Sequence, residues 1–153
     1  MLRKKICLLL VLFTITLTTM PAGAEMVTVI GDNVNLRKGP GTDYPILWEY
    51  GSDFPLKVIS HKDGWLQVKD FENDMGWIHK SLLKKKPVVI VKANKNGKGV
   101  INIREEPTTS SDIIGKAYYG VVFQLIEKKT GWARVKHESG LKGWINNNLL
   151  WGY

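Results

Sequence analysis

The side chains best suited to ligand contact are aromatic residues close to a glycine–proline turn, Gly39-Pro40-Gly41, and their nearest counterparts in the second half of the chain. They are Tyr44, Trp48, Tyr50, Tyr118 and Tyr119. Aromatic faces beside a rigid turn suit the binding of sugar rings, peptides or proline-rich segments. We therefore predict these residues as ligand contacts. The alternative is that they cover the open side of a domain or dock two domains together.

Residue types that carry out catalysis are present but lack the spacing that catalysis needs. His61, His79 and His137 form no H-x-H or H-x-x-x-H pair, so we expect no metal site. No serine lies in a G-x-S-x-G turn, and Gly97-Lys98-Gly99 lacks the rest of a phosphate-binding loop. The single cysteine, Cys7, lies in an apolar N-terminal segment. The sequence therefore predicts no catalytic residue, no metal and no cofactor, that is, a non-enzymatic protein.

The first 24 residues have the three parts of a secretory signal peptide. A basic stretch at 2–5 precedes a mainly apolar run at 6–17, and small residues follow at Ala22 and Ala24. The apolar run has 12 residues, whereas a membrane span needs about 20. We predict cleavage after Ala24 and export to the periplasm or the medium, with no stable membrane span afterwards. An uncleaved N-terminal anchor is the alternative.

The rest of the chain contains one internal repeat. Segments 34–37 and 101–104, 64–65 and 131–132, and 76–78 and 143–145 match at a shift of 67 residues. Between them, a small compensated insertion and deletion is predicted to align Gly51 with Gly120 and Phe54 with Phe123. Residues shared by both copies are expected to be structural. These include core tryptophans at 65, 77, 132 and 144, and arginines at 37 and 104 that pair with acidic neighbours.

Each copy has about five short segments rich in β-forming residues, separated by turn residues, and no sustained helical period. This pattern predicts an all-β fold in which each copy closes into a small barrel without exposed sheet edges. The predicted divisions are a signal peptide at 1–24, a first domain at 25–83, a linker at 84–87 and a second domain at 88–153.

Three motifs of the first copy resemble those of bacterial SH3-like domains. They are Val34 to Ile46, Asp63 to Val68 and Gly76 to Leu83. The resemblance implies two tandem SH3-like β-barrels outside the cytoplasm, of a kind that commonly binds cell walls or targets a neighbouring domain. In the second copy, Glu105-Glu106-Pro107-Thr108 replaces the Gly-Pro-Gly loop and Gly115 stands in place of Trp48. The second copy is therefore expected to bind differently or not at all.

Charge differs between the two copies. Residues 25–83 carry six basic and nine acidic side chains, 84–86 are three lysines, and 87–153 carry ten basic and five acidic side chains. A basic half suits anionic cell-surface polymers or acidic proteins, and predicted export argues against nucleic acid. The expected partner is peptidoglycan or an envelope protein. The alternative function is a protein–protein adaptor or assembly factor in the periplasm.

Overall fold

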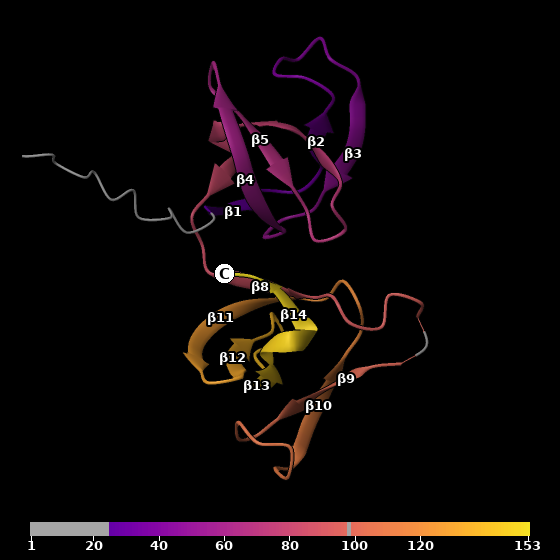
Figure 1. The fold of residues 1–153 in the computed structure, drawn as a ribbon, viewed down its shortest axis with the longest axis vertical. Helices are drawn as coiled ribbons and strands as arrows, with labels where there is room; N and C mark the ends of the chain where they lie inside the picture. The colour runs from indigo at the N-terminus through magenta and orange to yellow at the C-terminus, as the bar shows by residue number, and fades with distance from the viewer. Residues whose placement is uncertain (1–24, 98) are drawn as a thin grey trace, which may run out of the picture.

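The computed structural model describes residues 25–97 and 99–153, so the predicted signal peptide lies outside the described residues. Two β-sheets account for most of them (Figure 1). The first contains β1 (Met26–Val29), β2 (Val34–Arg37), β3 (Ile46–Tyr50), β4 (Pro55–Lys62), β5 (Trp65–Lys69), β6 (Met75–His79) and β7 (Leu83–Lys84). The second contains β8 (Val88–Val91), β9 (Ile101–Arg104), β10 (Ile113–Ala117), β11 (Val122–Lys129), β12 (Trp132–Lys136), β13 (Lys142–Asn146) and β14 (Leu150–Gly152). Short 3-10 turns at Lys80–Leu82 and Asn147–Leu149 precede the last strand of each sheet.

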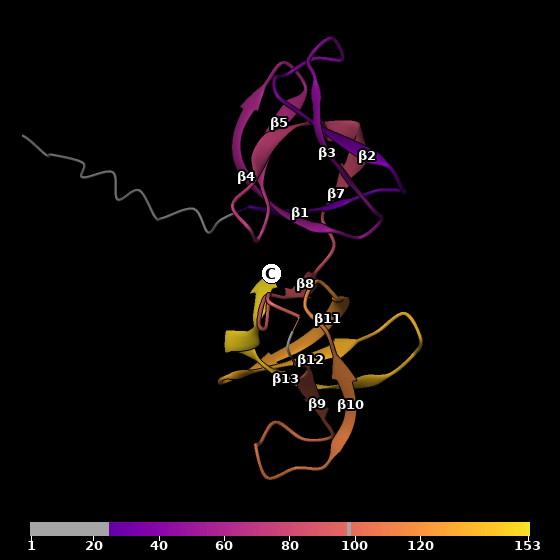
Figure 2. The same cartoon turned by 90° about the vertical axis from the view of Figure 1, so that its right-hand side faces the viewer.

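Both sheets have the same antiparallel topology. The order is β3-β2-β6-β5-β4-β1-β7 in the first and β10-β9-β13-β12-β11-β8-β14 in the second. Each sheet curls around its own core, and the two lobes follow one another along the chain (Figure 2). The prediction of an all-β, two-barrel chain is confirmed. The predicted complete closure is wrong, because the described pairings of the first sheet end at β3 and β7 and leave both as edge strands.

Strand alternation places Trp65, Trp77 and Trp132 on the strand face opposite the buried residues. In β5, Leu66 and Val68 point inward, so Trp65 lies on the opposite face. Neither of the two described core clusters contains a tryptophan; they are built from Val, Leu, Ile and Ala with one Tyr or one Phe. Trp144 is buried separately, beneath the ammonium group of Lys129, which lies 5.0 Å from the centre of its ring. The prediction that the shared tryptophans are core residues is therefore wrong for Trp65, Trp77 and Trp132, whereas Trp144 is buried.

Strand pairing also corrects the alignment of the two copies. Val29 pairs with Leu83 as Val91 pairs with Leu150, whereas β2 and all later strands correspond at a constant shift of 67. The five extra residues of the second copy therefore lie between β8 and β9. Gly120 corresponds to Asp53, and both have a positive φ. The predicted insertion and deletion near Gly51 does not exist, because the turn needs its left-handed residue at the same place in each copy.

The barrels contact each other around the junction between β7 and β8. The ammonium groups of Lys84 and Lys86 lie 3.1 and 2.6 Å from the carboxylate of Asp53. The hydroxyl of Tyr153, at the C-terminal end, donates to the carbonyl of Met26 at 2.7 Å. The first and last strands of the described chain are thus tied together across the junction. Among the described residues, no helix is long and apolar enough to cross a membrane.

Candidate binding site

A groove of about 530 Å³ opens on the outer face of the first barrel. It is bounded by the β1–β2 loop, β2, the β2–β3 loop, the start of β5 and the 3-10 turn. Its lining residues are Ile30, Asp32, Asn33, Val34, Asn35, Arg37, Thr42, Trp65, His79, Ser81 and Leu82. We call it groove 1. An aromatic ring among amide, hydroxyl and charged groups is suited to a polar polymer such as a glycan or a peptide.

The position of each lining side chain follows from strand alternation. Val34 and Leu36 are buried in the core, so Asn35 and Arg37 project from the other face of β2. Trp65 and His79 are directly paired across β5 and β6, and their rings meet edge to face with centroids 5.4 Å apart. The same alternation that builds the core therefore brings the groove residues together on the outer face.

Hydrogen bonds fix the imidazole of His79 in the groove. Its Nδ1 lies 2.8 Å from the hydroxyl of Ser81 and accepts the Ser81 backbone N–H at 3.4 Å. Because Nδ1 accepts, the neutral ring carries its hydrogen on Nε2. A Cβ at Gly64 would lie 3.3 Å from Nε2, so the glycine, which has φ of +84°, leaves this edge of the ring open. The site thus offers one N–H donor beside the indole of Trp65.

Arg37 forms the end wall of groove 1 by holding the β2–β3 loop. Its Nη1 donates to the carbonyls of Thr42 at 2.8 Å and Tyr44 at 2.9 Å. In the second barrel, Nη1 of Arg104 donates to the carbonyl of Ser111 at 2.6 Å. The predicted pairing with an acidic neighbour is therefore wrong. The carbonyl oxygens of the loop point toward the guanidinium, which can donate hydrogen bonds to several acceptors in one plane.

The second barrel has a corresponding groove of about 270 Å³, which we call groove 2. Its lining residues are Asn94, Val100, Ile101, Asn102, Arg104, Thr109, Trp132, Asn146 and Leu149. Eight of these occupy positions 67 residues after groove 1 residues, and five are the same type: Asn, Arg, Thr, Trp and Leu. Asn146 replaces His79 and keeps its capping role, accepting the backbone N–H of Asn148 at 2.9 Å.

The predicted aromatic contacts do not form one site. Tyr44 and Trp48 are 47% and 63% exposed, but neither lines groove 1. The ring of Tyr44 packs over Gly39, where an added Cβ would lie 2.3 Å from it. Tyr118 is 66% exposed in the second barrel. Tyr119 is half-buried between the barrels, where its ring lies 5.2 Å from that of Phe71. Tyr119 therefore fits the docking alternative.

Tyr50 is a core residue, so its prediction as a ligand contact is wrong. It is 2% exposed, its ring stacks on Phe54 at 4.6 Å, and its hydroxyl donates to the carboxylate of Asp70 at 3.0 Å. Burial, and then the negative charge of Asp70, raise the pKa of Tyr50 well above its ordinary value. Tyr50 ends β3 on the inward side of the strand, which its aromatic type could not reveal.

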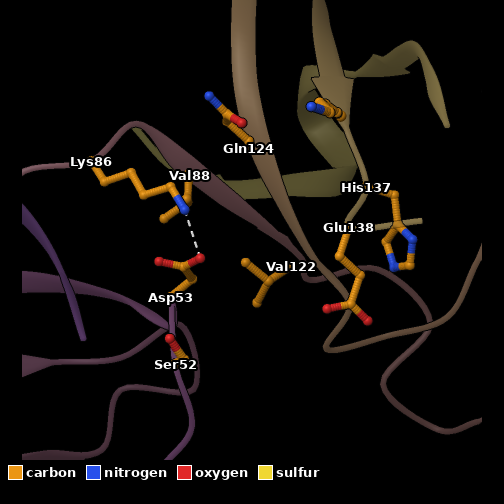
Figure 3. Close-up of a pocket in the computed structure, with 9 residues that line it drawn as sticks. Ser52, Asp53, Lys86, Val88, Val122, Gln124, His137 and Glu138 are labelled. Carbon is orange, nitrogen blue, oxygen red and sulfur yellow. Dashed lines mark hydrogen bonds and ion pairs between the residues drawn. The ribbon is translucent and has the colours of Figure 1, made fainter. Parts of the chain in front are cut away.

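A polar cleft of about 370 Å³ lies between the barrels (Figure 3). Asp53 and Lys86 meet on one side of it, and His137 and Glu138 stand on the other. Burial alone would raise the pKa of Asp53, but hydrogen bonds from Lys86 and Lys84 outweigh it and lower the pKa. The described residues contain no group of three or more His, Cys, Asp or Glu that could hold a metal ion.

Sequence reasoning missed both grooves because it treated repeated residues as structural. The available signal was alternation: Asn35 and Arg37 fall on one face of β2, opposite two buried aliphatic residues. A repeated polar residue on an outward position needs another explanation than core packing. Both copies show this alternation, with buried and partly exposed residues in turn along β2 and β9.

Comparison with known proteins agrees with the fold. Residues 31–85 match the family SH3_4 and residues 98–150 match the family SH3_3, both described as bacterial SH3 domains. The "Putative N-acetylmuramoyl-L-alanine amidase YrvJ" of Bacillus subtilis (strain 168) is 24% identical over 141 residues. That alignment takes in 88% of this chain but only 27% of the relative, so the chain spans about a quarter of that protein.

Two solved structures illustrate the structural likeness. "Endolysin LysPBC5 CBD" is 17% identical with a TM-score of 0.34, over 87% of this chain and 96% of that one. An NlpC/P60 family protein from Bacillus cereus ATCC 10987 is 15% identical with a TM-score of 0.38, over 84% of this chain and 56% of that one. With the family matches and the paired sheets together, the chain belongs to the bacterial SH3 domain proteins and carries two such domains in tandem.

Proposed function

We propose that the chain is a non-enzymatic binding protein of the bacterial cell envelope, and that grooves 1 and 2 hold peptidoglycan. The observation that carries this proposal is the recurrence of four polar or aromatic side chains at matching positions of both grooves: asparagine, arginine, threonine and tryptophan. Of the four, the arginines also hold a loop in each barrel, whereas no hydrogen bond within the described residues assigns such a role to the asparagines or the tryptophans. Their common use is to present a ring and polar groups to a ligand.

The chemistry of the grooves fits a peptide-bearing glycan. The indoles of Trp65 and Trp132 offer flat apolar faces for a sugar ring or a peptide methyl group. Amide and hydroxyl groups beside them can bond to sugar hydroxyls and peptide carbonyls. The described relative from Bacillus subtilis carries an amidase name that refers to N-acetylmuramoyl-L-alanine, a peptidoglycan bond. Each groove is open at the surface, as a long polymer requires.

Co-sedimentation with purified peptidoglycan sacculi tests the proposal. The double variant Trp65→Ala, Trp132→Ala should reduce retention about tenfold at moderate salt, which corresponds to ~1.4 kcal/mol. Trp48→Ala is the matched control, since Trp48 is an exposed tryptophan of the same barrel outside groove 1. Loss of retention in the Trp48 variant but not in the double variant would move the site to β3. No retention of the unchanged protein would refute peptidoglycan binding.

Export and lack of catalysis belong to the same proposal. Fractionation of cells that produce the full sequence should place the protein in the periplasm or the medium, without residues 1–24. Incubation with sacculi should release no soluble fragments. Release that disappears with one side-chain substitution would instead make the protein an enzyme.

A protein–protein adaptor is the second candidate, and one observation favours it. Ile46, Leu47 and Trp48 are all exposed on β3, which is an edge strand of the first sheet. An exposed apolar edge can pair with a strand of another protein. Under this function, an envelope protein should co-purify with the unchanged chain, and Leu47→Lys should release it while leaving binding to sacculi intact.

A further inference from the structure

The second barrel has a pocket of about 280 Å³ at the end of β10 that is separate from groove 2. Aliphatic and aromatic side chains form most of its wall, with polar groups at the rim. The lining residues are Ile103, Lys116, Ala117, Tyr118, Val121, Phe123, His137, Ser139 and Leu141. None of them lines groove 2, so the pocket requires its own explanation.

The first barrel fills the corresponding place with its own phenol ring. Tyr50 pairs with Val34 on β2, and Ala117 pairs with Ile101 on β9, so the two residues occupy the same position in their sheets. The ring of Tyr50 lies in the first core and stacks on Phe54. In the second barrel, a methyl group replaces that ring.

The residues around the pocket also differ from those at the corresponding positions of the first barrel. Val121 stands where Phe54 stands, so the ring that stacks on Tyr50 is also missing. Leu141 stands where Asp74 stands and packs against the second core, which makes that wall apolar. Phe123, in place of Leu56, takes up only part of the space, since a pocket remains. The pocket therefore has mostly apolar walls, and no side chain of the second barrel occupies the place of the Tyr50 ring.

The polar group that faces the position of the ring is an acceptor in the first barrel and a donor in the second. In the first barrel, the carboxylate of Asp70 accepts the hydroxyl hydrogen of Tyr50 at 3.0 Å. In the second, Nδ1 of His137 accepts the backbone N–H of Ser139 at 3.2 Å and lies 2.9 Å from its hydroxyl. The neutral imidazole therefore carries its hydrogen on Nε2. A ring in this pocket would find an N–H donor, and Lys116 at the rim adds a second one.

We propose that this pocket binds one aromatic ring that bears an oxygen acceptor, in the place that Tyr50 occupies in the first barrel. The ligand class is a phenol, either as a free small molecule or as the tyrosine side chain of another protein. Tyr118, which is exposed at the rim, covers the ring once it is bound. The first barrel supplies the template for both the size and the chemistry of the ligand. The site is independent of peptidoglycan binding by the grooves.

Amide NMR titration of the full chain tests the proposal with 4-methylphenol as the probe. Saturable shifts should appear at Ala117, Tyr118 and His137, with a dissociation constant in the millimolar range. The counterparts Tyr50, Gly51 and Asp70 are internal controls and should not shift. A parallel titration with the peptide Gly-Tyr-Gly distinguishes the sources, because tighter binding of the peptide would indicate a protein ligand. Absence of saturable shifts with both probes would overturn the proposal.

Variants at Ala117 show whether the ring enters the pocket. Ala117→Tyr supplies an internal phenol and should abolish the shifts while the amide spectrum of the first barrel stays unchanged. Ala117→Val adds two methyl groups in a residue type that strands accept, and should weaken binding at least threefold. The valine variant keeps the test decisive if the tyrosine variant does not fold. Unchanged affinity in a folded variant of either kind would place the probe elsewhere and contradict the assignment.

Discussion

The hydroxyl of Tyr119 in the second barrel donates a hydrogen bond to the carboxylate of Glu72 in the first. The ammonium group of Lys95 holds the other oxygen of Glu72 at 3.1 Å, and the ring of Phe71 lies against that of Tyr119. Burial and this hydrogen bond raise the pKa of Tyr119 above its ordinary value. One residue of the first barrel is thus held by two loops of the second, so these contacts restrict how the barrels move relative to each other.

Removal of the Tyr119 hydroxyl should loosen the docking of the barrels without unfolding either one. In Tyr119→Phe the ring contact with Phe71 remains but the donor to Glu72 is lost. Because the pair is near the surface, we expect a change in stability below ~1 kcal/mol. Small-angle X-ray scattering should show a larger radius of gyration. Tyr118→Phe, on an exposed neighbour, is the control, and an equal effect of both variants would refute the role of Tyr119.

Docking should also weaken in acid. The hydrogen bond from Tyr119 and then the contact with Lys95 lower the pKa of Glu72. A carboxyl group with a lowered pKa stabilises the docked form above its ordinary pKa, and this contribution is lost as pH falls through the lowered value. The pKa of Asp53 is also lowered, by Lys86 and Lys84, but this carboxylate holds the linker and β7 rather than the second barrel.

Scattering between pH 6 and pH 3 measures this effect. The radius of gyration should stay constant above the ordinary range of carboxyl groups, roughly pH 4, and rise below it. Glu72→Gln removes the titrating carboxylate that contacts the second barrel and should give a smaller rise. A transition centred at neutral pH would contradict the assignment to carboxylates and point to the histidines instead.

Removal of the Tyr50 hydroxyl should destabilise the first barrel. In Tyr50→Phe the ring still fills the core, but one oxygen of buried Asp70 loses its donor. Loss of a partner by a buried polar group costs about 1–3 kcal/mol. Urea unfolding should detect this change in the free energy of unfolding. Tyr44→Phe, on an exposed ring, should change it by less than ~0.5 kcal/mol. Equal stability of Tyr50→Phe and the unchanged protein would show that the hydrogen bond to Asp70 does not stabilise the first barrel.

A methyl group at Gly76 should disrupt the contact between β6 and β2. The added Cβ would lie 2.6 Å from Cγ of Leu36 and 2.7 Å from the carbonyl oxygen of Arg37, so the strands would have to separate. Overpacking of this kind costs about 1–3 kcal/mol. In Gly51→Ala the new methyl group has open space, since only Asp32 comes within 4.0 Å. Thermal unfolding should therefore show a much lower melting temperature for Gly76→Ala and almost the same melting temperature for Gly51→Ala.

Much of the fold could be predicted from the sequence because each motif occurs twice, so that each copy supports the interpretation of the other. Short β-rich segments and matching motifs gave the all-β class and two similar units. The alignment failed near Gly51 because Gly120 resembles it in type, whereas the backbone requires equivalence with Asp53, which also has a positive φ. Residue type alone does not show that an aspartate occupies a glycine-like turn.

The candidate site was harder to predict, because residue type does not give the direction of a side chain on a short strand. Trp65 was predicted as core for its size, yet the smaller neighbours Leu66 and Val68 fill the core and turn the indole outward. Tyr50 was predicted as a surface ligand contact, yet it is the residue that points inward. The strand register, which depends on long-range pairing, decided both positions.

The most direct test of groove binding is an NMR titration of the indole N–H signals with soluble disaccharide-peptide fragments of peptidoglycan. Each tryptophan gives one such signal, so the protein carries its own reporters inside and outside the grooves. We predict saturable shifts for Trp65 and Trp132, and none for Trp48 on the exposed edge strand. Shifts of Trp48 alone, or no shift of any indole at saturating fragment concentration, would contradict the assignment of the grooves as peptidoglycan sites.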